Sequence, residues 1–352
     1  MRLEFISRVK EGDTLAKSIF SGDGKVLLRA GVSLTYSYIE KLRQLDVLYV
    51  YVEDERLGDL DLEDAKLNEL KLNTVKNMSN IIKKLISNDR VDLRESLTKV
   101  EELMNYVIEF GDVNKSLNDI KTHDNYTFVH SIDTGIMATF LGINMNMSRE
   151  ELVTLGIAAT LHDIGKVKID KDVINKPSAL SDMEYLEMKK HPVYGAEILK
   201  LNSNLSLKII DAVLQHHERV DGKGYPFGLK GNEITRNAKI ISVCDVYDAV
   251  SNDRCYRSKF NPKDAYELIL AGSGSFFDKE VVMTFRNTFA VYPLGCCLRL
   301  SNGVEGYVIK QNKGFPDRPV VRVLYDSETR RPIPFHEINL LEEINIGVEY
   351  TI

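Results

Sequence analysis

Histidine is concentrated in the middle of this 352-residue chain. Five of its seven histidines stand at positions 130, 162, 191, 216 and 217, all but the last on separate predicted helices or helix ends. The apolar residues of this region recur with helical spacing, which predicts a mainly α fold. A lone histidine on a helix usually has an ordinary structural role. Carboxylates accompany these histidines at specific positions, however, and that pattern weakens the ordinary explanation.

The dipeptide His162-Asp163 closes the apolar helical segment Leu152–Leu161 and precedes Ile164-Gly165-Lys166. Imidazole and carboxylate groups suit first-row divalent metals such as iron and manganese. An adjacent His-Asp pair offers a nitrogen to one ion and a carboxylate that can bridge two. Lys166 follows one turn later, close enough to hold a phosphate. The dipeptide alone is weak evidence, because chance produces it often.

The dipeptide His216-His217 is a stronger signal, because it ends a predicted helix and runs into the loop Glu218–Pro226. Its paired imidazoles can reach one metal or two neighbouring ones. Glycines within the loop permit a tight, irregular path. Asp245 stands within the predicted helix Ile240–Val250, where a buried carboxylate is costly without a partner. A metal ion would supply that partner.

Together these segments resemble the HD-GYP subgroup of the HD-domain phosphohydrolases. The resemblance covers about residues 119–290, roughly half of the chain. The matching residues are His162–Lys166, His191-Pro192, His216–Pro226, Asp245–Ala249, Asp253-Arg254 and Tyr256-Arg257.

The resemblance implies a site that holds two divalent metal ions, iron or manganese more often than zinc. The implied ligands of the first metal are His130, His162, Asp163 and Asp245, with Asp163 bridging to the second. The implied ligands of the second metal are His191, His216 and His217. The implied substrate-binding residues are Lys166, Tyr225, Arg254 and Arg257.

The activity implied by the resemblance is hydrolysis of cyclic di-GMP to pGpG, with further cleavage to GMP. In this hypothesis a hydroxide bridging the two metals attacks phosphorus, and Asp163 and Lys166 are the catalytic residues. The metals and Lys166 would absorb charge on the phosphoryl oxygens. Lys166 or a metal-bound water would protonate the leaving oxygen. Arg254 and Arg257 would clamp the second phosphate through planar, bidentate contacts.

The sequence departs from the family pattern at two places. Some relatives bind a third metal through a glutamate four residues before the first ligand histidine, where this chain has Tyr126, so two metals are expected. Cys255 replaces a proline beside Arg254, which puts substrate affinity in doubt. The side chains of Asp124 and Asp248 suit either partners of ligand histidines or exposed helix caps.

The domain boundaries are expected near residues 56, 118 and 290. Residues 1–56 should form a small α/β module, with a hairpin around Ser21–Gly24, a helix capped by Thr35 and a strand at 47–52. A polar linker is expected from Asp54 to Asp64. Residues 119–290 should form an HD-type helical bundle, and 291–352 a small β-rich extension.

Residues 57–118 should form a helical linker with two apolar stripes. The first runs from Leu67 to Leu85 and the second from Leu97 to Val107. Both stripes either pack on the rest of the chain or form the seam of a homodimer.

Composition excludes several other classes of protein. The formal net charge of −6 argues against a nonspecific nucleic-acid binder, which needs a broad basic surface. The sequence shows neither a secretory signal nor an apolar run of about 20 residues that would insert into a membrane. Its four cysteines suit neither a disulfide framework nor a zinc site, so we expect reduced thiols in a cytoplasmic protein.

Cyclic di-GMP is the expected ligand, with a diguanylate cyclase or other signalling proteins as further partners. One alternative is a phosphohydrolase for another substrate, such as a cyclic GMP-AMP dinucleotide or a nucleotide monoester. The other is a sensor that binds the dinucleotide without cleaving it. Inactive relatives typically lack HD or GYP residues, whereas this chain has every proposed ligand. The N-terminal module could also gate the enzyme, and it shows no phospho-acceptor pattern.

Overall fold

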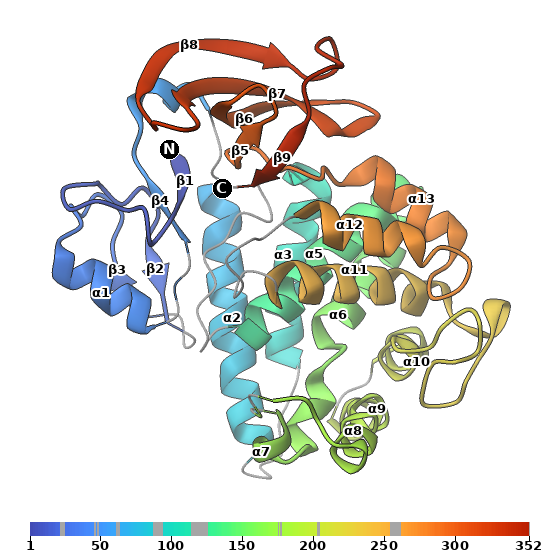
Figure 1. Ribbon diagram of the computed structural model, residues 1–352. Helices are drawn as coiled ribbons and strands as arrows, with labels where there is room; N and C mark the ends of the chain where they lie inside the picture. The colour runs from blue at the N-terminus through green and yellow to red at the C-terminus, as the bar shows by residue number, and fades with distance from the viewer. Residues whose placement is uncertain are drawn as a thin grey trace.

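A helical core is packed beside a small N-terminal module and below a C-terminal sheet, and these two smaller parts adjoin each other (Figure 1). The computed structural model describes residues 1–21, 25–45, 47, 49–60, 64–86, 94–113, 126–174, 176, 178–202, 205–253 and 262–351. Within them, a mixed N-terminal module and a five-stranded C-terminal sheet flank the helices. The prediction of a mainly α fold with these two flanking parts is confirmed.

The N-terminal module contains two antiparallel strand pairs and one helix. Strand β1 (Arg2–Phe5) pairs with β4 (Tyr49–Val52), and β2 (Ile19–Phe20) pairs with β3 (Val26–Leu28). The predicted hairpin is therefore present, although most of its turn lies outside the described residues. Helix α1 (Tyr36–Gln44) begins as predicted, because the Thr35 side chain accepts a hydrogen bond from the Tyr38 N–H.

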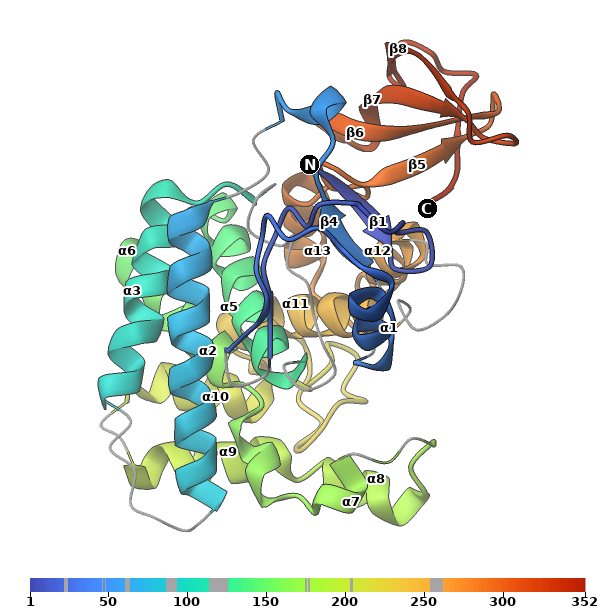
Figure 2. The same ribbon diagram turned by 90° about the vertical axis from the view of Figure 1, so that its left-hand side faces the viewer.

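Two long helices, α2 (Ala65–Ile86) and α3 (Arg94–Phe110), pack side by side (Figure 2). Their apolar stripes belong to the same buried cluster as the central helices. Met78 on α2 and Val100 on α3 are 4 % and 0 % exposed, for example. The stripes pack on their own chain, so they give no support to a homodimer seam.

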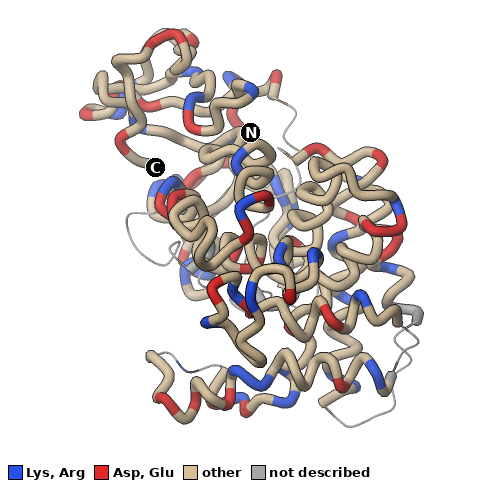
Figure 3. The backbone as a smooth tube through the Cα atoms, turned by 90° about the vertical axis from the view of Figure 1, so that its right-hand side faces the viewer, with Lys and Arg blue, Asp and Glu red and all other residues tan. Residues whose placement is uncertain are grey.

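The central helices form the largest apolar core of the described residues. They are α5 (Tyr126–Asn144), α6 (Arg149–Leu161), η3 (Ile164–Lys168), α7 (Lys171–Ile174), α8 (Asp182–Met188), α9 (His191–Asn202), α10 (Leu207–Gln215), η4 (Gly231–Glu233), α11 (Arg236–Asp253), α12 (Pro262–Ala271) and α13 (Lys279–Thr288). None of the helices within the described residues is long and apolar enough to span a lipid bilayer. On the face seen in Figure 3, basic and acidic residues are interspersed.

The C-terminal strands form one antiparallel sheet. They are β5 (Cys297–Leu300), β6 (Val304–Asn312), β7 (Phe315–Asp326), β8 (Pro332–Asn339) and β9 (Val348–Thr351), arranged in the order β8-β7-β6-β5-β9. The small β-rich extension predicted for residues 291–352 is therefore confirmed. The strands β8 and β9 extend that sheet at its two edges.

The segment from Asp54 to Leu60 joins the N-terminal module to the C-terminal sheet. Arg322 of β7 forms a bidentate ion pair with Asp59, at 2.6 and 2.8 Å, and donates to the Arg56 carbonyl. Leu57, in η1 (Glu55–Leu57), is fully buried against the sheet. The stretch predicted to be a polar linker is therefore bound to the C-terminal sheet over these residues, because its charged groups have partners on a distant strand.

Asp54 is the centre of the polar contacts in this segment. Its carboxylate accepts hydrogen bonds from Arg2 and from the side chain and backbone of Arg56. Arg56 also contacts the Tyr325 hydroxyl of the C-terminal sheet. Burial by itself raises the pKa of Asp54, but the hydrogen bonds outweigh it and lower that pKa to about 2.

We predict that Asp54→Asn lowers the free energy of unfolding by about 1–2 kcal/mol at pH 7, because it removes charge-assisted hydrogen bonds. An aspartate with a lowered folded-state pKa stabilises the fold above its ordinary pKa of about 4. The difference between the two proteins should therefore shrink below about pH 4 and vanish near pH 2. Urea unfolding followed by circular dichroism at several pH values measures it.

Glu40→Gln is the matched control, because it removes an exposed ion pair with Arg43 in the same module. Such pairs contribute little, so the free energy of unfolding should change by less than about 0.5 kcal/mol. Equal urea midpoints for Asp54→Asn and Glu40→Gln would contradict the proposed contribution of Asp54 to the free energy of unfolding.

Candidate metal centre

The His162-Asp163 dipeptide stands where α6 ends and the short helix η3 begins. Helix α6 starts at a capping box in which Ser148 and Glu151 bond to each other's backbone N–H groups. After Asp163, Gly165 brings η3 into contact with α9. A Cβ at this glycine would lie 2.0 Å from the His191 carbonyl oxygen. Only glycine allows this approach, which places Asp163 beside His191.

The loop after α10 folds back on its own first residues. A Cβ at Gly224 would lie 2.6 Å from the His217 carbonyl oxygen, so glycine is required for this path as well. The Tyr225 N–H donates to the same carbonyl, and the Tyr225 ring stacks on the His217 imidazole with centroids 4.7 Å apart. The buried Glu218 carboxylate accepts two backbone N–H bonds from the far side of the loop. The loop therefore holds Tyr225 against a predicted ligand.

The remaining predicted ligands come from two helices that pack together, α5 and α11. His130 lies near the start of α5, and Asp245 in the middle of α11. The His130 Nε2 atom is 3.1 Å from Asp245 Oδ1. Its Nδ1 atom is 2.6 Å from Asp248 Oδ2, so Asp248 is a partner of His130 rather than an exposed cap.

The structure brings all seven predicted ligands into two adjoining clusters. In each cluster, the candidate ligand atoms lie within 4.8 Å of one another. The first cluster contains His130, His162 and Asp245, and the second contains Asp163, His191, His216 and His217. Six of the seven residues are buried, and His217 is partly exposed.

Three of the histidines are held in one tautomer by the same local device. The Nδ1 atoms of His162, His191 and His216 each lie 2.7 Å from the carbonyl oxygen of the residue three positions earlier. Because a carbonyl only accepts, each Nδ1 carries the proton and donates it. Each Nε2 atom then presents its lone pair to the cluster, as a metal ligand requires.

Asp163 connects the two clusters through its two carboxylate oxygens. Its Oδ2 atom lies 3.3 Å from His162 Nε2 and 4.0 Å from His130 Nε2. Its Oδ1 atom lies 3.3 Å from His191 Nε2, in the other cluster. One carboxylate thus faces both sets of nitrogens, as a bridging ligand would.

Several buried atoms of the clusters lack the partners that a protein interior normally provides. His162 Nε2 and Asp163 Oδ1 are buried without a hydrogen bond. His191 Nε2 and His216 Nε2 lie 3.2 Å apart, although the tautomers just described leave a lone pair on each. Metal ions would satisfy all of these groups, so the residues fit a binuclear metal site.

The protonation of the second cluster favours metal binding, whereas in the first cluster nearby carboxylates outweigh burial and raise the pKa of His130 to about 9 and that of His162 to about 10. Burial lowers the pKa of His191, His216 and His217, that of His217 to about 3. These imidazoles are therefore neutral at physiological pH, in the form that binds metals. Burial alone would raise the pKa of Asp163, but His162 and Lys166 outweigh it and hold that pKa well below its usual range.

Lys166 lies at the open side of the same carboxylate. Its Nζ atom is 2.5 Å from Asp163 Oδ2, and 32 % of its side chain is exposed. Burial lowers the pKa of Lys166, but the Asp163 charge outweighs it and raises the pKa overall. A fixed positive charge therefore stands beside the bridging carboxylate.

Some predicted residues lie outside the described part of the chain. These are Arg254 and Arg257, with Cys255 between them, and also Asp124. The side chain of Tyr126 lies outside it as well, although its backbone begins α5.

One buried ion pair near the site was not predicted. Lys71 of α2 lies 2.8 Å from Asp133, one turn after His130 on α5, and both side chains are buried. A lysine in an amphipathic helix normally faces water, so the presence of Lys71 in the sequence did not indicate a buried ion pair. The spacing of Asp133 from His130 was the only hint.

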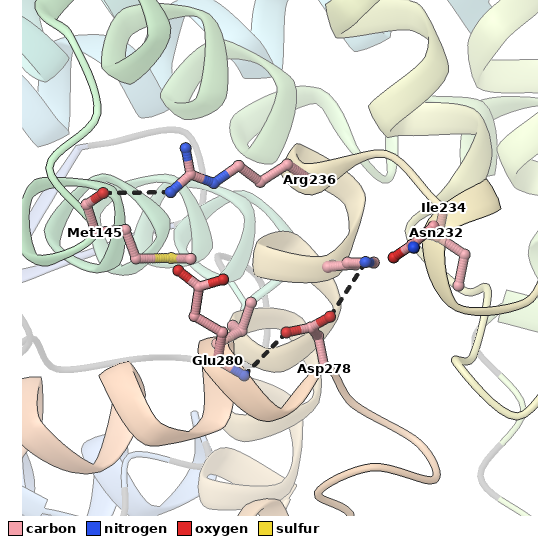
Figure 4. Close-up of a pocket in the computed structure, with 8 residues that line it drawn as sticks. Met145, Asn232, Ile234, Arg236, Asp278 and Glu280 are labelled. Carbon is pink, nitrogen blue, oxygen red and sulfur yellow. Dashed lines mark hydrogen bonds and ion pairs between the residues drawn. The ribbon is translucent and has the colours of Figure 1, made fainter.

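A surface pocket of about 350 Å³ lies apart from the clusters, since it is lined by none of the seven candidate ligands (Figure 4). Its cationic groups already have partners. Arg236 donates to the Met145 carbonyl, and Lys239 pairs with Asp278 at 3.1 Å. The pocket contains none of the seven candidate ligands, so the clusters remain the candidate site.

Comparisons with known proteins point to a single protein family. A family model described as "HD domain" matches residues 120–281, and one described as "KOW domain associated with HD domain" matches 297–349. The chain is 33% identical to the cyclic di-GMP phosphodiesterase PA4108 of Pseudomonas aeruginosa, over 71% of this chain and 60% of that protein. It is 29% identical to the cyclic di-GMP phosphodiesterase PdeB of Borreliella burgdorferi, over 58% of this chain and 54% of the relative.

The chain thus spans a little over half the length of these two relatives. A solved structure, the HDGYP protein Bd1817 of Bdellovibrio bacteriovorus, has a similar fold with a TM-score of 0.54. The similarity covers 80% of this chain and 97% of that one at 14% sequence identity. The fold of the present chain, its two buried His/Asp clusters and the matching HD-domain model lead to one conclusion. This chain belongs to the HD-domain phosphohydrolases.

Proposed function

We propose that this protein is a metal-dependent phosphodiesterase that hydrolyses cyclic di-GMP to pGpG and then to GMP. The observation that carries the proposal is the position of Asp163, whose two oxygens face separate histidine clusters while Lys166 contacts the same carboxylate. Two-metal sites of this kind suit in-line displacement at phosphorus. The two relatives named above are both cyclic di-GMP phosphodiesterases, which supports the choice of substrate.

We propose that the site holds two metal ions. Iron or manganese suits its set of imidazole and carboxylate ligands. His130, His162 and Asp245 would hold the first metal and His191, His216 and His217 the second, with Asp163 shared. When bound, the metals would supply positive charge at the phosphoryl oxygens and acidify a water molecule.

The protein groups around the clusters would bind and orient the substrate. Lys166 would stabilise negative charge on the phosphate under attack, because its own charge is fixed by Asp163. Tyr225, stacked on His217, offers an aromatic face beside the second cluster. Arg254 and Arg257 keep their proposed role in binding phosphate on the strength of the sequence resemblance alone.

The substrate proposal is tested with protein purified anaerobically and loaded with iron or manganese. We expect chromatography to show conversion of cyclic di-GMP to pGpG, and no conversion by the Asp163→Ala variant. A panel with cyclic GMP-AMP and nucleotide monoesters tests the other substrates. Tight binding of cyclic di-GMP without turnover would contradict the proposal and favour a sensor.

The metal proposal predicts different losses at different ligands. His130→Ala and His216→Ala should each lower the bound metal by about half, because each removes a ligand of one site. Asp163→Ala should remove nearly all of it, since both sites share this carboxylate. Elemental analysis gives the metal content per chain, with about two metals expected in the unaltered protein.

His336→Ala is the matched control for these variants, because His336 is exposed on β8. Its metal content should equal that of the unaltered protein. Full metal content in Asp163→Ala, or three metals per chain in the unaltered protein, would contradict the proposed site.

Lys166→Ala should separate metal binding from catalysis. We expect kcat to fall about 100-fold, because a fixed charge near the reacting phosphate is lost, while metal content stays unchanged. Lys168→Ala is the control, since Lys168 lies on the same short helix but pairs with Glu197 at the surface. A loss of metal in Lys166→Ala would show that the lysine instead supports the ligands.

A further inference from the structure

Lys189 is a cation at the edge of the candidate site that the proposed mechanism does not use. It ends α8, two residues before His191. Its Nζ atom lies 5.5 Å from the centroid of the Tyr225 ring, and that ring stacks on His217. Lys189 and His217 thus both approach the Tyr225 ring, at the edge of the second histidine cluster.

Lys189 differs from the neighbouring lysines in its partners. Lys176 pairs with Glu184, and Lys190 pairs with Glu187, each at 2.6 Å. Lys166 and Lys168 also pair with carboxylates. Within the described part of the chain, no carboxylate lies within 4.0 Å of Lys189, and its Nζ atom makes no hydrogen bond. Its charge is therefore available to an anionic ligand.

Two tyrosine rings hold the Lys189 ammonium near the site. The Nζ atom lies 4.5 Å from the centroid of the Tyr185 ring as well as near Tyr225. Such cation–π contacts position the ammonium, but the rings are neutral and leave its three N–H donors unused. Burial raises the pKa of Tyr225, which keeps that phenol uncharged. An oxyanion would complete the environment of Lys189.

We propose that Lys189 binds the phosphate of the cyclic dinucleotide that is not being cleaved. This inference rests on the proposed function. The bridging carboxylate and Lys166 mark where the scissile phosphate would bind. A cyclic dinucleotide has a second phosphate on the opposite side of its ring, away from the first. Lys189 lies beside Tyr225 at the edge of the second cluster, so it would bind this second phosphate together with Arg254 and Arg257, and it would determine preference for diesters that carry one.

The test compares substrates with and without a second phosphate. Lys189→Gln should raise KM for cyclic di-GMP about ten-fold and change kcat by less than about two-fold, because a charge-assisted contact to bound substrate is lost. With bis(p-nitrophenyl) phosphate, which has a single phosphate, kcat/KM should stay unchanged. Lys189→Arg, which keeps the charge, should restore most of the affinity for cyclic di-GMP.

Lys190→Gln is the matched control, because Lys190 is the next residue but pairs with Glu187 and is 53 % exposed. Its kinetic constants should equal those of the unaltered protein for both substrates. The inference is overturned if Lys189→Gln behaves like Lys190→Gln, or if it impairs both substrates equally.

These outcomes are distinguishable from failure of the proposed function. If the unaltered, metal-loaded protein cleaves bis(p-nitrophenyl) phosphate but not cyclic di-GMP, the proposed substrate is wrong and the role of Lys189 falls with it. If it cleaves cyclic di-GMP and Lys189→Gln leaves KM unchanged, only the role of Lys189 is wrong.

Discussion

One buried carboxylate, that of Asp163, connects the two histidine clusters of the candidate metal centre. It stands where α6 ends, and its oxygens reach nitrogens on α5, on α9 and on the adjacent His162. That reach depends on Gly165, because any side chain there would collide with the His191 backbone and push α9 away. The core around these helices is apolar, so the polar groups depend on one another and on metal.

This dependence makes the site costly to leave empty. Buried imidazole nitrogens that face each other, and a buried carboxylate oxygen without a donor, all lose solvation when the chain folds. Metal ions remove that cost and bind the folded state, so metal loading and stability are linked in this protein. The apolar helices must supply the stability of the metal-free chain, and the close packing of α2 and α3 on the central helices adds to it.

Local patterns in the sequence predicted more than long-range contacts did. Thr35 was identified as a helix cap from residues near it, and the seven ligand candidates from family motifs. Lys189 and the Lys71–Asp133 pair gave no such signal, because a lysine's partners depend on which helices meet in three dimensions. The contacts of the linker predicted from Asp54 were missed for the same reason: its polar residues pair with a strand near the other end of the chain.

That last contact has a consequence for the order in which the chain folds. The bonds from Arg322 to Asp59 and from Arg56 to Tyr325 join residues 263 and 269 positions apart. Contacts between such distant positions form late, since a long loop must close first. On the ribosome, Asp59 emerges well before Arg322 exists, so the segment from Asp54 to Leu60 must wait for the C-terminal sheet, while the apolar core of the N-terminal module is made of its own residues. Strand β7 thus completes the packing of a segment that is synthesised long before it.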